Sequence, residues 1–414
     1  MTQNTITEPV RSCPQGQSVI GFEDTDPFGF YAALHKMGSP VWDETAKAWL
    51  IHDYEQCLSS ERDESRFANA YVFADPIVSE IKGGGANITL SRDAEHMKLR
   101  RFHFKLLSAA MVETYRQPHI ISVIDAMLDR LEGQKTADLA ADFAAQIPPR
   151  VICSLLGMPV DDDAMVEEIL ARNVDIVSFI ASGYRDERLR DIALQASHRL
   201  NEMLRPWIVE RKNKPADDFI SRVWKEAAVF GIDLDEAGAL GLCRELFFAG
   251  SDTTVHGIAN ALYLVLNNPT LMKRAREDSS GETIERIVEE ALRLFAVVQF
   301  RHRVCLEDTE VGDTLIRKGE VIILLHAAAN RSPGRYACPN GVDMQQPSPA
   351  EHLTFARGTR SCVGAHLARV EMREAVQRLL ERFPNVCMDA TKEAPYFRGL
   401  YMRSMGPLPV QLTP

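Results

Sequence analysis

The sequence lacks the features that mark membrane and secreted proteins. None of its apolar runs approaches the roughly 20 residues that a membrane span needs. The first residues, MTQNTITEPVRSCPQGQ, have neither a basic start nor an apolar core, so no secretory signal is expected. The eight cysteines lie far apart and none forms a CxxC pair, which argues against a disulfide framework and a structural zinc site. We therefore expect a soluble, cytoplasmic and reduced protein.

The sequence also lacks internal repeats, low-complexity linkers and an excess of basic residues. Its 47 Lys and Arg against 58 Asp and Glu leave a net charge of −11, which argues against nucleic acid or a membrane surface as partner. The 414 residues are 45 % hydrophobic and 25 % charged, which excludes a disordered, collagenous or coiled-coil protein. No polar, Pro/Gly-rich seam divides the chain. We expect residues 1–414 to form a single domain, with a poorly ordered N-terminal tail over residues 1 to about 20.

Apolar residues repeat at three- and four-residue spacing along most of the chain, which predicts helices. The clearest patterns cover residues 118–131, 164–180, 188–211, 245–266 and 283–295, and another over 138–156 is interrupted by Pro148 and Pro149. Alternating apolar residues predict two strands within 40–52, a small antiparallel sheet after Phe300 and a final hairpin within 398–412. The expected fold class is mainly α with small antiparallel β-sheets.

Residues 355–364, FARGTRSCVG, form the most informative segment of the chain. Cys362 lies just before a helical pattern, where unpaired backbone N–H groups and the helix dipole favour negative charge. Such groups lower the pKa of a thiol and stabilise the thiolate. Gly358 and Gly364 allow a tight turn and the close approach of a flat ligand.

Three roles remain open for Cys362 at this point. It is a buried structural cysteine, a nucleophile assisted by His352 or His366, or a metal thiolate. Haem iron accepts a single cysteine thiolate as axial ligand because the porphyrin supplies the four equatorial donors. Zinc instead needs three or four protein ligands.

The pattern FxxGxRxCxG followed by HLAR resembles the haem-binding loop of the cytochrome P450 superfamily. Ala356 stands where glycine is usual and Ser361 at a variable position, and neither departure touches the ligand itself. The resemblance implies that Cys362 is the axial thiolate of haem b. It also implies that Phe355 and Gly364 lie against the cofactor.

Glu290 and Arg293 lie upstream in the family's order, within the helical pattern 283–295. Residues at i and i+3 are neighbours on a helix surface, and an exposed pair of this kind has little energetic weight. By resemblance the two form the ExxR element. That element has a structural role, in which both charges pair with a loop arginine ahead of the cysteine loop.

Farther upstream, the pattern 245–266 contains AGSDTT in the middle of a helix. Gly, Ser, Asp and Thr weaken a helix there, so a helix interrupted at this point opens a groove, or is simply kinked. The segment resembles the family's oxygen-activating stretch. The resemblance places Ala249 and Gly250 against the cofactor and makes Asp252 and Thr253 an acid–alcohol pair that delivers protons to dioxygen.

The segment 93–101, DAEHMKLRR, resembles the family's helix in which a His and an Arg reach a haem propionate. His96 and Arg100 are one turn apart on one helix face, which suits two donors to one carboxylate. By the same resemblance Arg303, His352 and Arg360 also bind the propionates. Each of these five residues is otherwise an ordinary surface base.

The resemblance spans roughly residues 93–380 and implies the triangular, mostly helical haem-thiolate monooxygenase fold, with haem between two long helices. The implied reaction inserts one atom of dioxygen into a C–H bond or adds it to a double bond. The chain has no GxGxxG-bearing βαβ unit and no clustered cysteines, so no flavin or iron–sulfur cluster is expected in it. A separate ferredoxin-type donor is expected to dock on basic residues near the cysteine, namely Lys98, Arg101, Lys105, Arg357 and Arg369.

Three rival functions belong to other classes. A peroxide-driven haem peroxygenase and a non-catalytic haem protein have no use for the Asp252–Thr253 pair, and a hydrolase with Cys362 as nucleophile predicts no pigment. The expected substrate is a small to medium hydrophobic molecule of terpenoid or aromatic type, and the expected state is a monomer. The expected pocket is apolar and comprises Leu246, Phe247, Val297, Val298, segments 71–86 and 177–182, and residues near Leu400.

Overall fold

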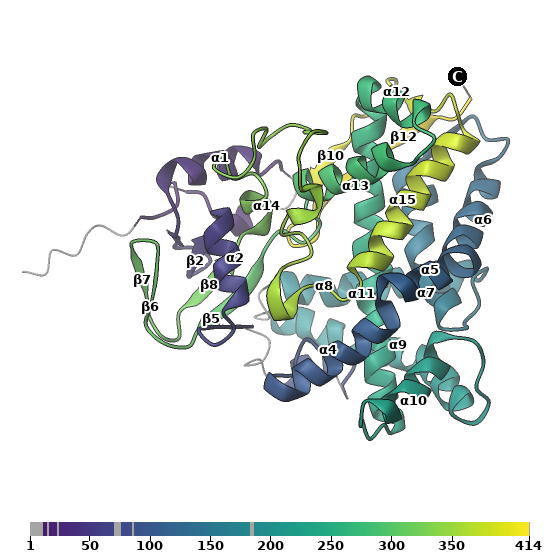
Figure 1. Cartoon of the computed structure of the whole chain (residues 1–414), viewed down its shortest axis with the longest axis horizontal. Coiled ribbons are helices and arrows are strands. Elements are labelled where there is room, and N and C mark those ends of the chain that lie inside the picture. Colours follow the sequence, from purple (N-terminus) through teal and green to yellow (C-terminus); the bar gives the residue numbers. More distant parts are fainter. Residues whose placement is uncertain are drawn as a thin grey trace, which may run out of the picture.

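The computed structural model describes residues 11–14, 16–22, 25–69, 76–84, 87–182 and 186–413. It is mainly helical with small sheets, as the periodicity predicted. Figure 1 shows a β-rich region with α1, α2 and α14 beside a larger helical region arranged around α11. The α-helices are α1 (Phe28–Met37), α2 (Tyr54–Arg62), α3 (Pro76–Ile81), α4 (Asp93–Leu107), α5 (Ala109–Tyr115), α6 (Ser122–Leu131), α7 (Ile147–Leu155), α8 (Asp163–Ala181), α9 (Glu187–Asn213), α10 (Phe219–Val229), α11 (Glu236–Leu266), α12 (Pro269–Glu277), α13 (Glu282–Leu294), α14 (His326–Ala329) and α15 (Ala365–Arg382).

The largest sheet has the strand order β1-β2-β8-β5-β3. Strands β2 and β8 run parallel, with Leu50 opposite Ile323, and the other neighbours in this sheet are antiparallel. The antiparallel pairing predicted after Phe300 is confirmed for β5 with β8 and for β6 with β7, but β5 and β8 belong to a mixed sheet that also contains N-terminal strands. The strands are β1 (Val41–Asp43), β2 (Ala48–Ile51), β3 (Phe67–Asn69), β4 (Thr136–Asp138), β5 (Arg301–Cys305), β6 (Thr309–Val311), β7 (Thr314–Ile316), β8 (Val321–Leu324), β9 (Cys387–Met388), β10 (Tyr396–Arg398), β11 (Ser404–Gly406) and β12 (Pro409–Gln411).

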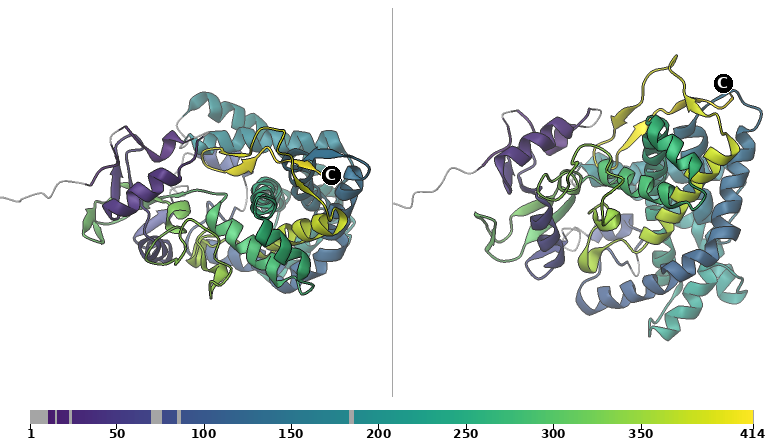
Figure 2. Two further views of the ribbon diagram at one scale, coloured as in Figure 1. Left: turned by 90° about the horizontal axis from the view of Figure 1, so that it is seen from above. Right: turned by 45° about the horizontal axis from the view of Figure 1, so that its top comes forward.

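The long helix α11 lies at the centre of the helical region and contacts α7, α9, α13 and α15. Figure 2 shows it among these helices in two further views. Asp235 begins the helix, because its carboxylate accepts the N–H of Gly238 at 2.7 Å. The helix predicted over residues 245–266 is confirmed, but it begins earlier, at Glu236. The predicted interruption at AGSDTT was wrong, since α11 is continuous from Glu236 to Leu266.

Two glycines allow other helices to approach α11 closely. A Cβ at Gly250 would lie 2.7 Å from Cδ1 of Ile152 on α7, and a Cβ at Gly257 would lie 3.0 Å from Sδ of Met372 on α15. The glycine in the AGSDTT stretch therefore serves helix packing. Close packing of α11 with α7 and α15 offsets the weak helix propensity of the stretch.

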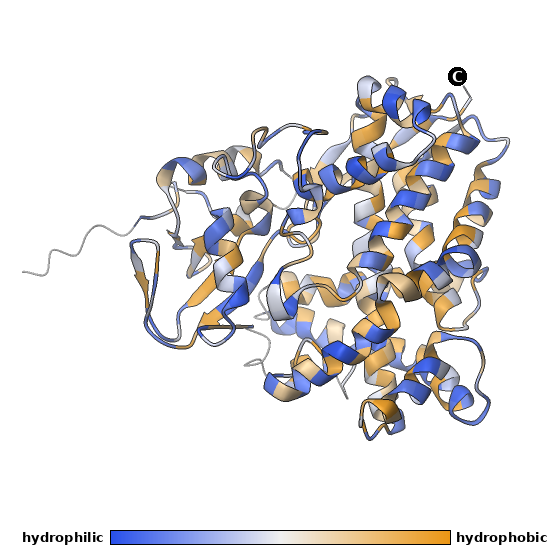
Figure 3. Cartoon of the chain, in the orientation of Figure 1, coloured by the Kyte–Doolittle hydropathy of each residue, from blue (hydrophilic) through white to orange (hydrophobic). Residues whose placement is uncertain are grey.

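The helices that cover α11 are amphipathic. Helix α13 buries Ile284, Ile287, Val288, Ala291 and Leu292, the apolar face that the sequence predicted. Figure 3 shows hydrophilic residues on the remaining surface of α13 and α15. In the part of the chain that the structure describes, no helix is long and apolar enough to cross a membrane.

The N-terminal segment 1–20 is only partly described. Residues 11–14 and 16–20 make defined contacts: Cys13 N–H donates to the Trp42 carbonyl at 2.9 Å, and Trp42 N–H donates to the Arg11 carbonyl at 2.7 Å. The rest of the predicted tail lies outside the described residues. All eight cysteines are described and free.

Candidate active site

The cysteine loop is fixed from both sides. The N–H of Cys362 donates to the Phe355 carbonyl at 2.8 Å, which closes the loop on itself. The N–H of Arg357 donates to the Glu61 carboxylate at 2.7 Å, and the Thr359 hydroxyl donates to Glu64 at 2.9 Å. Helix α2 and the turn after it therefore hold the loop that leads to Cys362.

The thiol of Cys362 lies directly before α15, and the N–H of Gly364 donates to it. The residue lines a depression of about 370 Å³, so part of its surface is accessible, but dense surroundings desolvate the sulfur. Burial raises the pKa of the thiol, and the Gly364 N–H with the charges of Arg301, Arg369 and Arg100 lowers it in part. The sequence predicted a lowered pKa. For the protein without a bound metal that prediction was wrong, because burial raises the pKa of Cys362 by more than the helix N-terminus and the nearby charges lower it.

His96 and Arg100, four residues apart on α4, both reach the cysteine loop. The ring nitrogens of His96 lie 3.0 Å from the Ile88 carbonyl oxygen and 3.1 Å from that of Thr359. Arg100 donates to the carbonyl and the hydroxyl of Ser361 at 2.7 and 2.6 Å. Among the described residues its hydrogen-bond partners are neutral, and burial lowers its pKa. Within the described part of the chain this guanidinium therefore has no carboxylate partner, and it is suited to one from a ligand.

Two other predicted cations already have protein carboxylates nearby. Arg360 pairs with Glu64 and also donates to the Ser91 carbonyl at 2.8 Å. Arg303, on β5, lies 3.7 Å from Glu61. Sequence reasoning missed Arg301, whose charge acts on Cys362. The alternation of a strand could have found it, because residues 301 and 303 share one face of β5.

The residues around Cys362 fit a haem. No group of three or more His, Cys, Asp or Glu that could hold a metal ion occurs within the described ranges. A single thiolate therefore suits an ion that brings its remaining ligands with it, as haem iron does. A metal also keeps its coordinating thiol deprotonated, which overcomes the raised pKa of Cys362. Arg100 and His96 supply donors beside the loop for the propionates.

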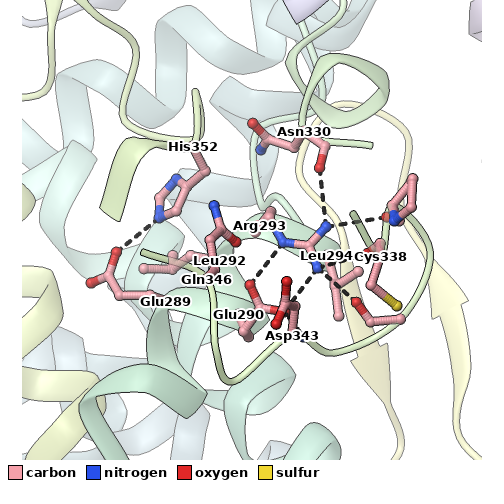
Figure 4. Close-up of polar contacts among 12 residues, drawn as sticks. Glu289, Glu290, Leu292, Arg293, Leu294, Asn330, Cys338, Asp343, Gln346 and His352 are labelled. Carbon is pink, nitrogen blue, oxygen red and sulfur yellow. Dashed lines mark hydrogen bonds and ion pairs between the residues drawn. The ribbon is translucent and has the colours of Figure 1, made fainter. Parts of the chain in front are cut away.

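His352 and Glu289 form a buried pair (Figure 4), and Arg369 also contacts the Glu289 carboxylate. The His352 Nε2 lies 3.0 Å from Glu289, and its Nδ1 accepts the Thr354 N–H at 3.3 Å, which assigns a neutral ring that donates to Glu289. Burial lowers the pKa of His352, consistent with that neutral form. Burial alone would raise the pKa of Glu289, but the hydrogen bonds from His352 and Arg369 outweigh it and lower the pKa to about 2. The structure thus gives His352 a protein partner, and its propionate role stays a prediction.

Glu290 and Arg293 form a bidentate pair on α13, at 2.8 Å for both contacts. Both side chains are fully buried, unlike the exposed pair that the spacing alone allowed. Arg293 also donates to the carbonyls of Asn330 at 3.2 Å and Gly341 at 2.7 Å, and Glu290 accepts the Asp343 N–H at 2.6 Å (Figure 4). The pair therefore fastens the loop before the cysteine segment to α13.

The loop arginine expected beside this pair is absent. The chain has no Lys or Arg between Tyr336 and Ala356, and the residue drawn next to the pair in Figure 4 is Gln346. The prediction of a third charge was wrong. Backbone groups of the loop satisfy the guanidinium and the carboxylate in its place.

On α11 the predicted acid–alcohol pair occupies consecutive positions. The Thr253 hydroxyl donates to the Ala249 carbonyl at 2.8 Å, and Asp252 is 7 % exposed. The Asp252 Oδ1 lies 3.7 Å from Nε2 of His256, and Nδ1 of His256 lies 3.0 Å from the Ser404 hydroxyl. Sequence reasoning missed His256, although its i+4 spacing from Asp252 places it on the same helix face.

The two predicted pocket residues on α11, Leu246 and Phe247, face different sides of that helix. Leu246 is about 60° from Ala249 around the helix, whereas Phe247 is about 160° away and fully buried. Val297 is buried, and its carbonyl accepts the Arg403 N–H at 2.9 Å. Val298 bridges to Met402. Within the predicted segment 71–86, residues 71–75, 85 and 86 lie outside the described residues.

Comparison with known proteins gives one family. A family model described as cytochrome P450 matches residues 64–414. The biotin biosynthesis cytochrome P450 of Bacillus subtilis is 31 % identical over 373 residues, covering 87 % of this chain and 90 % of the relative. The cytochrome P450 monooxygenase PikC of Streptomyces venezuelae is 29 % identical, covering 93 % of this chain and 91 % of the relative.

A solved structure shares the fold over almost the whole chain. P450BioI, crystallised in complex with an acyl carrier protein ligated to hexadec-9Z-enoic acid, aligns with a TM-score of 0.83 and 27 % identity. The alignment covers 93 % of this chain and 98 % of that one. The match confirms the expected mainly helical fold.

The Glu289–His352–Arg369 contacts predict an acid-dependent contribution to stability. The pKa of Glu289 is lowered from 4.5 to about 2, so its contribution is complete above about pH 4.5 and is lost as the pH falls toward 2. We expect Glu289→Gln to lower the free energy of unfolding by about 2 kcal/mol at neutral pH. The deficit should shrink below about pH 4.5.

Urea unfolding of both proteins from neutral pH down to about pH 3 tests this expectation. The exposed Glu277→Gln on α12 is the control and should match the parent throughout. A deficit for Glu289→Gln that is constant across this range would contradict the assignment.

Proposed function

The chain belongs to the cytochrome P450 family and is a P450 monooxygenase, and we propose that it uses haem b with Cys362 as axial thiolate to oxidise a hydrophobic small molecule. The observation that carries this proposal is the position of Cys362, which lies at the N-terminus of α15, receives the Gly364 N–H and is surrounded by guanidinium charges. Haem bound there supplies the reductive splitting of dioxygen and the transfer of one oxygen atom to the substrate.

The residues of this chain would hold the cofactor from two elements. The Gly364 N–H and the charges of Arg301 and Arg100 favour the thiolate form of Cys362. Arg100 and His96, both on α4, would turn their donors from loop carbonyls to the propionates. Arg303 and Arg360 would add positive charge at the same edge.

We assign proton delivery to α11. Asp252 would hold a proton at Oδ1 and exchange it with His256, 3.7 Å away, which contacts Ser404. The Thr253 hydroxyl, which donates to the Ala249 carbonyl at 2.8 Å, would turn away from that carbonyl to hold and pass on a proton where dioxygen is split. The close approach of α15 to α11 at Gly257 and Met372 would limit the access of water to this part of α11.

The hydrophobic substrate proposal rests on buried apolar residues beside this stretch, including Leu246 and Val297. The acyl group named in the P450BioI structure supports a hydrophobic substrate for this chain as well. Terpenoid and aromatic molecules, the types expected from the sequence, meet the same requirement, and the monomer remains the expected state.

We propose that a separate ferredoxin-type protein delivers the electrons at the face of Cys362. The depression that Cys362 lines also has Arg62, Phe104, Arg357 and Arg369 in its walls. Arg101 and Lys105, on the neighbouring turns of α4, are exposed. An acidic partner complements this basic rim despite the net charge of −11.

Replacing Thr253 tests the proton-delivery proposal. We expect Thr253→Ala to lower the product formed per reducing equivalent by about tenfold or more and to raise hydrogen peroxide release, because the distal oxygen loses its donor. Ser251→Ala is the matched control, since the Ser251 hydroxyl donates to the Phe247 carbonyl at 2.6 Å in the same helix and is buried. Equal coupling in Thr253→Ala and the parent, as a peroxide-driven enzyme would give, would contradict the proposal.

Charge reversal tests the docking proposal. Arg101→Glu combined with Lys105→Glu should slow reduction by a ferredoxin about tenfold at low salt, and the difference should shrink at high salt. Lys273→Glu with Arg276→Glu is the control, because these exposed residues lie on α12 at the opposite end of the molecule from α4 (Figure 1). Stopped-flow absorbance measures the rates. Unchanged reduction in the α4 variant would rule out this docking face.

A further inference from the structure

Among the residues that the structure describes, Arg244 on α11 is a buried cation with no hydrogen-bond or ion-pair partner. The residue is 1 % exposed, and none of its three guanidinium nitrogens has a hydrogen-bond partner among the described residues. Other fully buried arginines have carboxylate partners: Arg293 pairs with Glu290, and Arg150 with Asp163. No role in the haem site or in proton delivery accounts for Arg244.

An unpaired charge at this depth destabilises the chain unless an anion joins it. Burial lowers the pKa of Arg244 to about 9, so the side chain is still charged at neutral pH. No other charged residue acts on it appreciably, because burial is the single cause of the shift. The counter-ion must therefore come from outside the described residues.

The neighbouring acid does not fill this role. Glu245 accepts the N–H of Ile88 at 2.9 Å and that of Thr89 at 3.3 Å, and it lies 3.8 Å from Nε2 of His103. Its carboxylate thus ties α11 to the segment before α4. The Arg244 side chain instead extends from α11 toward Gly83.

The chain makes room for the Arg244 side chain. A Cβ at Gly83 would lie 2.4 Å from Cγ of Arg244, and Gly83 has φ +101°, which other residues rarely adopt. The stem of Arg244 therefore crosses the backbone just after α3, and its guanidinium carbon lies 6.0 Å from the Phe248 ring centroid. A glycine at this crossing is required for the arginine to lie there.

Arg244 lies on the side of α11 that leads to the acid–alcohol pair. Phe248 and Asp252 follow it at about 40° and 80° around the helix, and Asp252 is about 12 Å farther along the axis. An anion on Arg244 would therefore be on the order of 10 Å from the Asp252 position of α11. An apolar body of that length would lie along Phe248.

We propose that Arg244 binds the carboxylate of the substrate, so that this enzyme oxidises an amphipathic carboxylic acid at a carbon remote from the carboxyl group. The inference rests on the proposed monooxygenase function and specifies its substrate class. A planar guanidinium matches a carboxylate with two parallel hydrogen bonds. A single cation also neutralises one carboxylate, whereas a phosphate group carries more charge than one arginine balances.

Ligand titrations of the haem-loaded protein test the proposal. The probes are the unbranched acids from octanoic to hexadecanoic and their methyl esters, followed by the change in the haem absorption band. We expect at least one acid to bind the parent more than tenfold tighter than its ester. Arg244→Gln should weaken binding of that acid at least tenfold and leave the ester unchanged, and Arg244→Lys should fall between. Arg276→Gln, an exposed arginine on α12, is the control and should match the parent.

Thermal unfolding provides a readout that does not depend on the haem. The same acid should raise the Tm of the parent but not that of Arg244→Met, and Arg244→Met should have the higher Tm without ligand because an unpaired buried charge is removed. Gly83→Ala, whose Cβ displaces the Arg244 stem, should lose acid binding as Arg244→Gln does.

The outcomes separate this inference from the function on which it rests. Equal affinity for every acid and its ester in the parent, or equal loss of both in Arg244→Gln, would overturn the carboxylate site while leaving the monooxygenase proposal intact. A parent protein without a thiolate-ligated haem spectrum would overturn the proposed function. An acid-specific rise in Tm that needs Arg244 would then still support the site.

Discussion

The arrangement of the molecule depends on keeping one desolvated sulfur, that of Cys362, negatively charged. Burial raises the pKa of the Cys362 thiol. The Gly364 N–H and three arginines, one each from α4, β5 and α15, lower that pKa in part. These contributions do not outweigh desolvation by themselves, so the thiolate is stable when a metal supplies the remaining charge. The site is therefore organised for an ion that arrives with its own equatorial ligands.

Buried charges also fix the loop that carries this sulfur. Glu290 and Arg293 hold the loop before it through backbone groups, and Glu289 joins α13 to α15 through His352 and Arg369. Each of these charges has partners, as burial requires. Arg244 departs from this rule among the described residues, which is why we connect it with a ligand.

Much of this account follows from local sequence. Periodicity predicted the helices that became α8, α9 and α13, and the motif around Cys362 predicted its place before α15. Contacts between distant segments were not predictable in the same way. The pairing of β2 with β8, the Gln346 loop without a third charge and the contact of Gly83 with Arg244 depend on tertiary packing, which single-sequence patterns do not encode. The net pKa of Cys362 also depends on burial, and burial is a property of the fold.

The most direct test of the central claim is the absorption spectrum of the dithionite-reduced protein with carbon monoxide, recorded for the parent, Cys362→His and Cys387→Ser. The account predicts a strongly red-shifted Soret band for the parent and for Cys387→Ser, whose cysteine is exposed and lies on β9. In Cys362→His the band should move to the shorter wavelength of histidine-ligated haem. A parent protein that shows the shorter-wavelength band, or takes up no haem, would contradict the account.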